Sequence, residues 1–187
     1  MTDTSLVEKI KSGDQAAFND LVKQHQDFVL NVCFRFLGNR EDAQDATQEV
    51  FIKVYFAMQQ YAPNAKISTW IYRIAVNYCL NYKRSQKRKK QFFSFSTLQK
   101  EKENVEMVAD TNNDPEQNLH DAEKQKLVQQ ALAKLNDEQR TAIILHRYQG
   151  QSYKEIAEIM QTTTSSVESR IFRAKQQLAK YLKEYMI

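Results

Sequence analysis

Apolar side chains recur at spacings of three and four residues through most of residues 5–90, which is the repeat of an amphipathic helix. The clearest stripe consists of Phe18, Leu21, Val22, His25, Phe28, Val29, Val32 and Phe36. A second helix is predicted over residues 43–61 and a third over residues 66–90. Breaks are expected at Gly13-Asp14, Gly38-Asn39 and the Pro-containing segment 61–64, because glycine and proline interrupt helices.

The helical pattern resumes near Leu119, and the residues after it include side chains that commonly cap the starts of helices. Asn136 is a predicted N-cap for a helix that stops at Gly150. Two capping-box patterns follow. Ser152 with Glu155 is expected to open a short helix, and Ser165 with Glu168 a longer one. Gln161 lies in the turn between them, at a position where ordinary helix-turn-helix repressors commonly carry glycine.

Residues 96–119 interrupt the pattern. They contain few large apolar side chains, many Asn, Asp, Glu and Gln, and the dipeptide Asp114-Pro115. Such a segment cannot bury enough surface to offset its ordering entropy, so it is expected to be an extended linker. The 187-residue chain has only 3 glycines and 2 prolines, which leaves too few turn residues for a sheet-rich fold. The predicted class is all-α, with two small helical domains joined by a polar linker.

Several classes of protein are excluded by what the sequence lacks. No secretory signal and no apolar run long enough to span a membrane is visible, so a cytoplasmic protein is expected. Cys33 and Cys79 lie far apart in apolar runs, which is typical of buried thiols. His25, His120 and His146 are scattered, without metal-ligand spacing. No metal or cofactor is expected.

Charge is strongly segregated along the chain. Residues 61–90 carry 8 basic and no acidic side chains, and residues 83–90 alone hold 6 of these. A solvated helical face usually mixes signs, so this segment indicates a surface for a polyanion. On the face opposite the apolar stripe lie Thr69, Arg73, Asn77, Asn81 and Arg84.

These side chains suit a surface that holds phosphates and captures unpaired bases. An aromatic residue, Trp70, and several amides stand beside the basic stretch, as in proteins that bind single strands. An asparagine can bond the edge of a base that is turned out of the stack in two places. Two alternatives stay open: Asn77 fits an ordinary exposed amide, and Trp70 fits core packing.

A short helix, a turn of three or four residues and a longer helix are typical of a helix-turn-helix motif. The outward positions of the second helix are expected to be Ser165, Ser166, Ser169, Arg170 and Arg173. Small hydroxyls at a helix start can approach phosphates, and arginine is the commonest residue to bond guanine edges. A plain helical hairpin fits the same pattern.

Three stretches together resemble the extracytoplasmic-function (group 4) sigma factors of the sigma-70 family. They are DAQDATQEVFIK at 42–53, ISTWIYRIAVN at 67–77, and residues 138–175, which include SYKEIAEIM and SRIFRA. The resemblance covers roughly residues 5–183 in the order of the family. It implies a promoter-specificity subunit of bacterial RNA polymerase, with no enzymatic activity and no small-molecule substrate.

The resemblance also implies a division of the chain. Residues 1–91 would form a sigma-2-like domain, residues 92–119 a flexible acidic linker in the polymerase channel, and residues 120–187 a sigma-4-like domain. Docking on the clamp helices of the largest polymerase subunit would use Asp42, Asp45, Gln48, Glu49 and Phe51. The flap of the polymerase, promoter DNA and an anti-sigma factor are the other partners implied.

Two sets of DNA-binding residues follow from the same resemblance. The −10 element would be contacted by Thr69, Trp70, Arg73, Asn77, Asn81, Lys83, Arg84, Lys87 and Arg88, with Asn77 holding a flipped base. The −35 element would be contacted by Ser165, Ser166, Ser169, Arg170, Phe172 and Arg173. Glu168 departs from the family, which often carries Arg or Lys there, and puts the −35 sequence in doubt.

Two other classes of function compete with this one. A conventional dimeric repressor that uses only the helix-turn-helix would leave residues 61–90 and the N-terminal helices unexplained. It would also bind duplex operator DNA tightly without polymerase. An enzyme such as a nuclease or phosphohydrolase would need a metal-binding carboxylate cluster, a phosphate-cradling glycine loop or a nucleophile beside a base, and the sequence shows none of these patterns.

Overall fold

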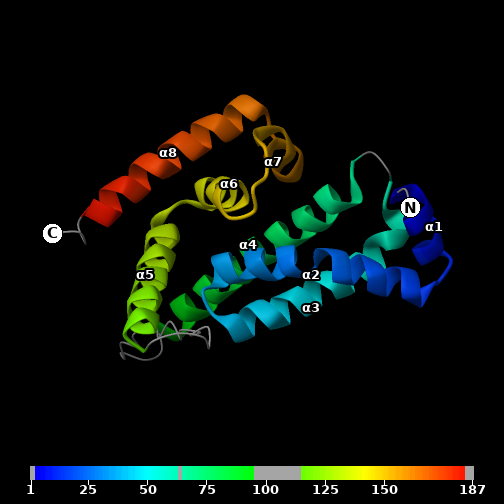
Figure 1. Cartoon of the computed structure of the whole chain (residues 1–187), viewed down its shortest axis with the longest axis horizontal. Coiled ribbons are helices and arrows are strands. Elements are labelled where there is room, and N and C mark those ends of the chain that lie inside the picture. The colour runs from blue at the N-terminus through cyan, green and yellow to red at the C-terminus, as the bar shows by residue number, and fades with distance from the viewer. Residues whose placement is uncertain (1–2, 63–64, 95–114, 184–187) are drawn as a thin grey trace.

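The structure is a computed structural model that describes residues 3–62, 65–94 and 115–183. Within these ranges every regular element is helical, as predicted. In chain order the elements are α1 (Asp3–Lys11), α2 (Gln15–Leu37), α3 (Arg40–Ala57), the 3-10 turn η1 (Met58–Gln60), α4 (Ile67–Ser94), α5 (Pro115–Lys134), α6 (Asp137–Arg147), α7 (Tyr153–Met160) and α8 (Thr164–Lys183). Figure 1 shows α2, α3 and α4 packed together, with α6 and α7 lying against them.

Local hydrogen bonds fix the ends of the N-terminal helices. Asp14 caps α2 by accepting a hydrogen bond from the backbone N–H of Ala17 at 3.0 Å. Gly38 ends the same helix with φ of 79°, a left-handed conformation that glycine adopts at little cost. Asn39 then caps α3 through the N–H of Glu41 at 2.8 Å. The predicted breaks at 13–14 and 38–39 are thereby confirmed.

Two of the predicted caps in the C-terminal half are also confirmed. The side chain of Asn136 accepts a hydrogen bond from the N–H of Gln139 at 2.8 Å and opens α6. Ser152 and Glu155 form a complete capping box at the start of α7. Glu155 accepts from the N–H of Ser152 at 2.9 Å, and these bonds lower the pKa of its carboxyl.

The start of α8 differs from the prediction. Thr163 is the cap, because its hydroxyl oxygen accepts a hydrogen bond from the N–H of Ser166 at 3.2 Å. The capping box predicted for Ser165 and Glu168 is therefore wrong. Gln161 ends α7 in a left-handed conformation, with φ of 52°. Helix α8 begins at Thr164, earlier than expected, so Thr163 rather than Ser165 is at the capping position.

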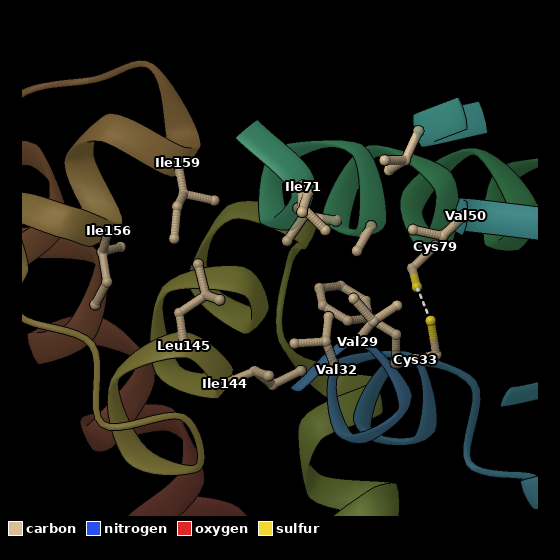
Figure 2. Packing of buried hydrophobic residues seen from close by; sticks show 14 of the residues in the cluster. Val29, Val32, Cys33, Val50, Ile71, Cys79, Ile144, Leu145, Ile156 and Ile159 are labelled. Atoms are coloured by element: carbon tan, nitrogen blue, oxygen red, sulfur yellow. Dashed lines mark hydrogen bonds between the residues drawn. The ribbon is translucent and has the colours of Figure 1, made fainter. Parts of the chain in front are cut away.

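One hydrophobic core extends through both halves of the described chain. The buried cluster includes Val29, Val32, Val50, Ile71, Ile144, Leu145, Ile156 and Ile159 (Figure 2). Helix α4 contacts α7, and α2 contacts α6. Full burial of a leucine or isoleucine side chain stabilises a fold by about 1.5–3 kcal/mol. The apolar contacts between residues 3–94 and residues 115–183 therefore hold the two halves together.

The helices next to the predicted linker are longer than expected. Helix α4 continues to Ser94 and α5 begins at Pro115, so residues 92–94 and 115–119 are helical. Proline at the first position of a helix costs no hydrogen bond, because the N–H that it lacks would have no partner there. Asp114-Pro115 thus precedes a helix rather than interrupting one. The rest of the predicted linker, residues 95–114, lies outside the described residues.

Limited proteolysis should cut within residues 95–114, because this segment is polar and poor in apolar side chains. The two fragments are expected to stay together after the cut, because α6 and α7 share a core with α2 and α4. Gel filtration without denaturant should give one peak that contains both fragments, and denaturant should separate them. Two separate peaks without denaturant would contradict the shared core.

Candidate nucleic-acid interfaces

Two asparagines that are predicted to contact DNA lie on the accessible side of α4. Asn77 and Asn81 are both exposed and are separated by one helical turn, so they lie on the same face. An asparagine amide provides donors and an acceptor, which allows paired hydrogen bonds to the edge of a base. The structure thus keeps both side chains free to meet a ligand.

Two other predicted contacts on α4 are partly or fully inside the bundle. Thr69 is only 3% exposed, so the prediction that it contacts DNA directly is wrong for this arrangement. It lies in the first turn of α4, between the buried residues Ile67 and Ile71. Trp70 is half-buried, with its ring centre 5.0 Å from that of Tyr61. This contact favours core packing for Trp70 over a base-stacking platform.

Arg73 is held by the other half of the chain. Its Nη2 donates a hydrogen bond to the backbone oxygen of Glu158 on α7 at 2.8 Å, while its buried Nε has no hydrogen-bond partner. The neighbouring Tyr72 is also affected by α7. Burial raises the pKa of Tyr72, and the negative charge of Glu155 raises it further. Helix α7 therefore covers the part of α4 that was predicted to bind DNA through Arg73.

The basic segment of α4 faces acidic side chains across a cleft. Arg84 forms an ion pair with Asp137 at the start of α6, with Nη2 and Oδ2 3.1 Å apart. A cleft of about 1200 Å³ separates these parts of α4 and α6, and its lining includes Lys83, Lys87 and Glu138. Arg88 is exposed farther along α4. A polyanion that binds this segment must compete with the Asp137 carboxylate for Arg84.

The predicted recognition surface on α8 is largely accessible. Ser165, Ser169 and Arg173 are exposed, Ser166 is half-buried, and Phe172 is 61% exposed. The opposite side of the helix is anchored in the core by Val167, Ile171 and Ala174. Glu168 is exposed and lies one turn before Phe172, so its negative charge is on the accessible side of α8.

Arg170 is the exception on this surface. Its Nε lies 3.1 Å from Oε2 of Glu138 on α6, and its side chain is only 19% exposed. The guanidinium therefore turns back towards α6, and the expectation that Arg170 points outward is wrong for this arrangement. The helical repeat predicts an outward position for Arg170, but the Glu138 carboxylate on α6 attracts its guanidinium towards the protein.

Most of the residues on α3 that are predicted to dock on polymerase are accessible, but not all of them. Asp45, Gln48 and Glu49 are exposed, and Asp42 is half-buried where it accepts a hydrogen bond from the hydroxyl of Tyr82 at 3.2 Å. Phe51 is 7% exposed and belongs to the core, so the prediction that it forms part of a docking surface is wrong. It is buried because it lies beside Val50 on the inner face of α3, which packs against α2 and α4.

Apolar residues that the sequence analysis missed extend this face of α3. Ile52, Tyr55 and Phe56 are 48%, 44% and 75% exposed. The sequence contains a signal for this apolar surface, because the helical repeat places these large side chains outside the buried stripe of Ala46, Val50 and Val54. Accessible aromatic and aliphatic side chains next to carboxylates are typical of a surface that binds another protein.

The described residues hold no arrangement suited to a metal ion, since no three His, Cys, Asp or Glu side chains among them come together. None of the described helices combines the length and apolar character needed to cross a membrane. The surfaces described above on α3, α4 and α8 carry charged, amide and aromatic groups.

Comparison with known families matches two separate parts of the chain. The chain matches the family described as sigma-70 region 2 over residues 21–89, and sigma-70 region 4 over residues 125–178. The first match spans most of α2, all of α3 and most of α4, and the second includes all of α6 and α7. The chain is also 34% identical to the ECF RNA polymerase sigma-E factor of Haemophilus influenzae, over 100% of this chain and 98% of that one.

Solved structures share the arrangement of helices. CnrH, solved in complex with the cytosolic domain of CnrY, gives a TM-score of 0.69 at 23% identity, over 97% of both chains. The sigma factor RpoE of Bartonella quintana, solved with the anti-sigma factor NepR, gives a TM-score of 0.64 at 21% identity, over 89% of this chain and 96% of that one. At these identities the likeness concerns the fold.

Proposed function

Because the chain belongs to the extracytoplasmic-function RNA polymerase sigma factors, we propose that its exposed faces divide the steps of promoter recognition among α3, α4 and α8. The chain is an alternative sigma factor that directs RNA polymerase to promoters. Sigma factors are initiation factors rather than enzymes, and we propose that this one contains no catalytic site. The conventional repressor is not favoured.

We propose that residues 1–91 form the docking and −10 half, residues 92–119 the connection, and residues 120–187 the −35 half. This division is supported by where the helices that carry each surface lie along the chain. Helices α3 and α4 lie in the first range, and α8 lies in the last. The connection would pass through the polymerase channel, and the action would take place in the cytoplasm. The C-terminal half would also contact the flap of the polymerase.

The proposed docking surface on α3 consists of acidic and apolar side chains together. Asp45, Gln48 and Glu49 supply charged and polar groups, and Ile52 and Phe56 supply exposed apolar area. Charges at the rim of an interface guide association, while a desolvated aromatic side chain at its centre provides most of the affinity. This combination fits a protein partner, which we propose to be the clamp helices of the largest polymerase subunit.

The proposed −10 surface is centred on Asn77, whose exposed amide can bond an unpaired base in two places. Asn81 extends the same face by one turn, and the exposed Lys87 and Arg88 can neutralise backbone phosphates beyond it. The single observation that carries this assignment is the exposure of both asparagines on one face of α4, next to a segment free of carboxylates.

The proposed −35 surface is on α8. Arg173 offers a guanidinium for a guanine edge, and the exposed ring of Phe172 offers apolar contact with a thymine methyl group. Ser165 and Ser169 can bond phosphates near the start of the helix. Glu168 on the same side would repel phosphates and favour cytosine, whose amino group can donate a hydrogen bond to a carboxylate.

The packing of the two halves means that promoter binding through Arg73 requires them to separate. Arg73 bonds the backbone of α7, and Arg84 pairs with Asp137. We propose that binding to polymerase opens this arrangement, which would uncover Arg73 and release Arg84 from Asp137 for contact with DNA. We also propose an anti-sigma factor as a protein partner of the closed form, on the basis of the fold that the chain shares with RpoE of Bartonella quintana.

Run-off transcription with purified core RNA polymerase tests this proposal. Core supplied with the chain should start transcripts at a defined set of promoters, and mapping of the start sites across the genome should identify a shared −10 and −35 sequence. The chain without core should bind the same DNA weakly. Tight binding of duplex DNA without core, with no transcripts in its presence, would favour the repressor instead.

A further inference from the structure

Two cysteines meet where α2 packs against α4. The Sγ atoms of Cys33 and Cys79 are 3.6 Å apart, and both residues are fully buried (Figure 2). They are far apart in sequence, so only the folded chain brings them together. Neither residue lies on the surfaces assigned to polymerase or DNA, and promoter recognition gives no reason for two thiols to be in contact.

The two sulfur atoms are close enough to be joined by a disulfide after a small movement. Two bonded sulfurs lie about 2.0 Å apart, so these atoms need to approach by about 1.6 Å. The two side chains point towards each other from neighbouring helices in Figure 2. Rotation of the side chains and a small shift of α2 against α4 can close the gap without a change of fold.

The two thiols differ in acidity, and the difference suggests which reacts first. The thiol of Cys79 donates a hydrogen bond to the sulfur of Cys33, and this bond lowers the pKa of Cys33. The same hydrogen bond and burial raise the pKa of Cys79. Both thiols are buried, so an oxidant reaches them only when α2 and α4 open locally. Since the thiolate is the nucleophile, Cys33 is then suited to attack the oxidant and Cys79 to react in a second step.

We propose that Cys33 and Cys79 form a redox-active pair, which a hydroperoxide converts into a disulfide between α2 and α4. In the first step the Cys33 thiolate attacks a peroxide oxygen, the O–O bond breaks, and a sulfenic acid forms as hydroxide leaves. In the second step the sulfur of Cys79 attacks the sulfenic sulfur, the S–O bond breaks, and the S–S bond forms. The Cys79 proton leaves with the second hydroxide, so two thiols are oxidised and hydrogen peroxide becomes two water molecules.

The disulfide would be a reversible one. A bond that must pull its two helices together is more easily reduced than a relaxed structural disulfide. Small thiols should therefore restore the pair, which is the behaviour of disulfides that respond to oxidation in reducing compartments. Because Cys79 is on the helix that carries Asn77, the bond would restrict movement of α4 relative to α2.

The test uses the full, folded chain. The reduced protein is treated with hydrogen peroxide, quenched in acid, denatured and alkylated, and its peptides are analysed by mass spectrometry. A peptide pair linking Cys33 to Cys79 is expected, with a mass lower by two hydrogen atoms, and dithiothreitol should return both thiols. Alkylation of both cysteines after peroxide treatment, or oxidation to sulfonic acids without a linked pair, would overturn the proposal.

Two matched variants test the order of the steps. Cys79→Ser keeps a hydrogen-bond donor beside Cys33 but removes the second thiol, so the sulfenic acid on Cys33 should persist and be trapped by dimedone. Cys33→Ser should give little dimedone adduct on Cys79. The reverse pattern would overturn the assigned order. Circular dichroism establishes that each variant is folded, and the linked peptide in the unaltered chain remains the primary measurement.

Discussion

Replacing both Asp45 and Glu49 with lysine should abolish association with core RNA polymerase while leaving the helical content unchanged. Both side chains are exposed on α3, and exposed carboxylates contribute little to folding. At an interface, by contrast, a like-charge contact costs several kcal/mol, so binding should weaken by about 100-fold or more. Co-purification with core and a direct binding titration measure the loss.

A charge-matched control separates docking from general electrostatics. Asp20 and Asp27 are exposed on α2, and their replacement by lysine changes the net charge by the same amount. That variant should bind core almost as tightly as the unaltered chain. Phe56→Ser should weaken binding without any change of charge, because Phe56 is 75% exposed beside the acidic residues. Normal co-purification of the Asp45 and Glu49 double variant would contradict the docking assignment.

Asn77→Ala and Arg173→Ala should impair different steps of initiation. Arg173→Ala should weaken binding of the holoenzyme to duplex promoter DNA by about 5- to 150-fold, the loss expected when a base-edge contact worth about 1–3 kcal/mol is removed. Melting of the promoter that remains bound should be normal. Asn77→Ala should leave closed-complex binding nearly unchanged and depress open-complex formation, because an unpaired base exists only after the strands separate.

Permanganate footprinting on duplex and pre-melted templates distinguishes these outcomes. A pre-melted bubble should not fully rescue Asn77→Ala, since the captured base still lacks its partner. Lys175→Ala removes one exposed positive charge from another side of α8 and should bind promoter DNA almost normally. Equal loss of closed-complex binding in the Asn77 and Arg173 variants, or normal melting by Asn77→Ala, would show that Asn77 does not capture a base.

The helices and most of their ends could be predicted from the sequence because the signals are local. Asp14, Asn39, Asn136 and Ser152 each satisfy backbone N–H groups within the next three residues, so a short window of sequence contains the whole interaction. The failure at α8 has a local cause as well. Several hydroxyl residues in a row could cap this helix, and the turn that begins at Gln161 leaves Thr163 in the capping position.

The direction of individual side chains could not be predicted, because it depends on contacts between distant segments. Arg73 and Arg170 occupy outer positions of their helices, yet each bonds a group on another helix, Glu158 and Glu138. Phe51 and Phe56 stand in the same helix with similar surroundings in sequence. The first is buried and the second exposed because α2 and α4 cover only one side of α3.

The position of α7 over α4 also has a consequence for the order in which the ribosome produces these surfaces. Helix α4 is complete at Ser94, and α7 is complete only at Met160. At about 5–20 residues per second, the intervening stretch of about 65 residues takes about 3–13 s to synthesise. Throughout that interval Arg73 has no α7 backbone to bond. Every new molecule therefore begins with Arg73 uncovered, and α7 can cover it only after residue 160 has been made.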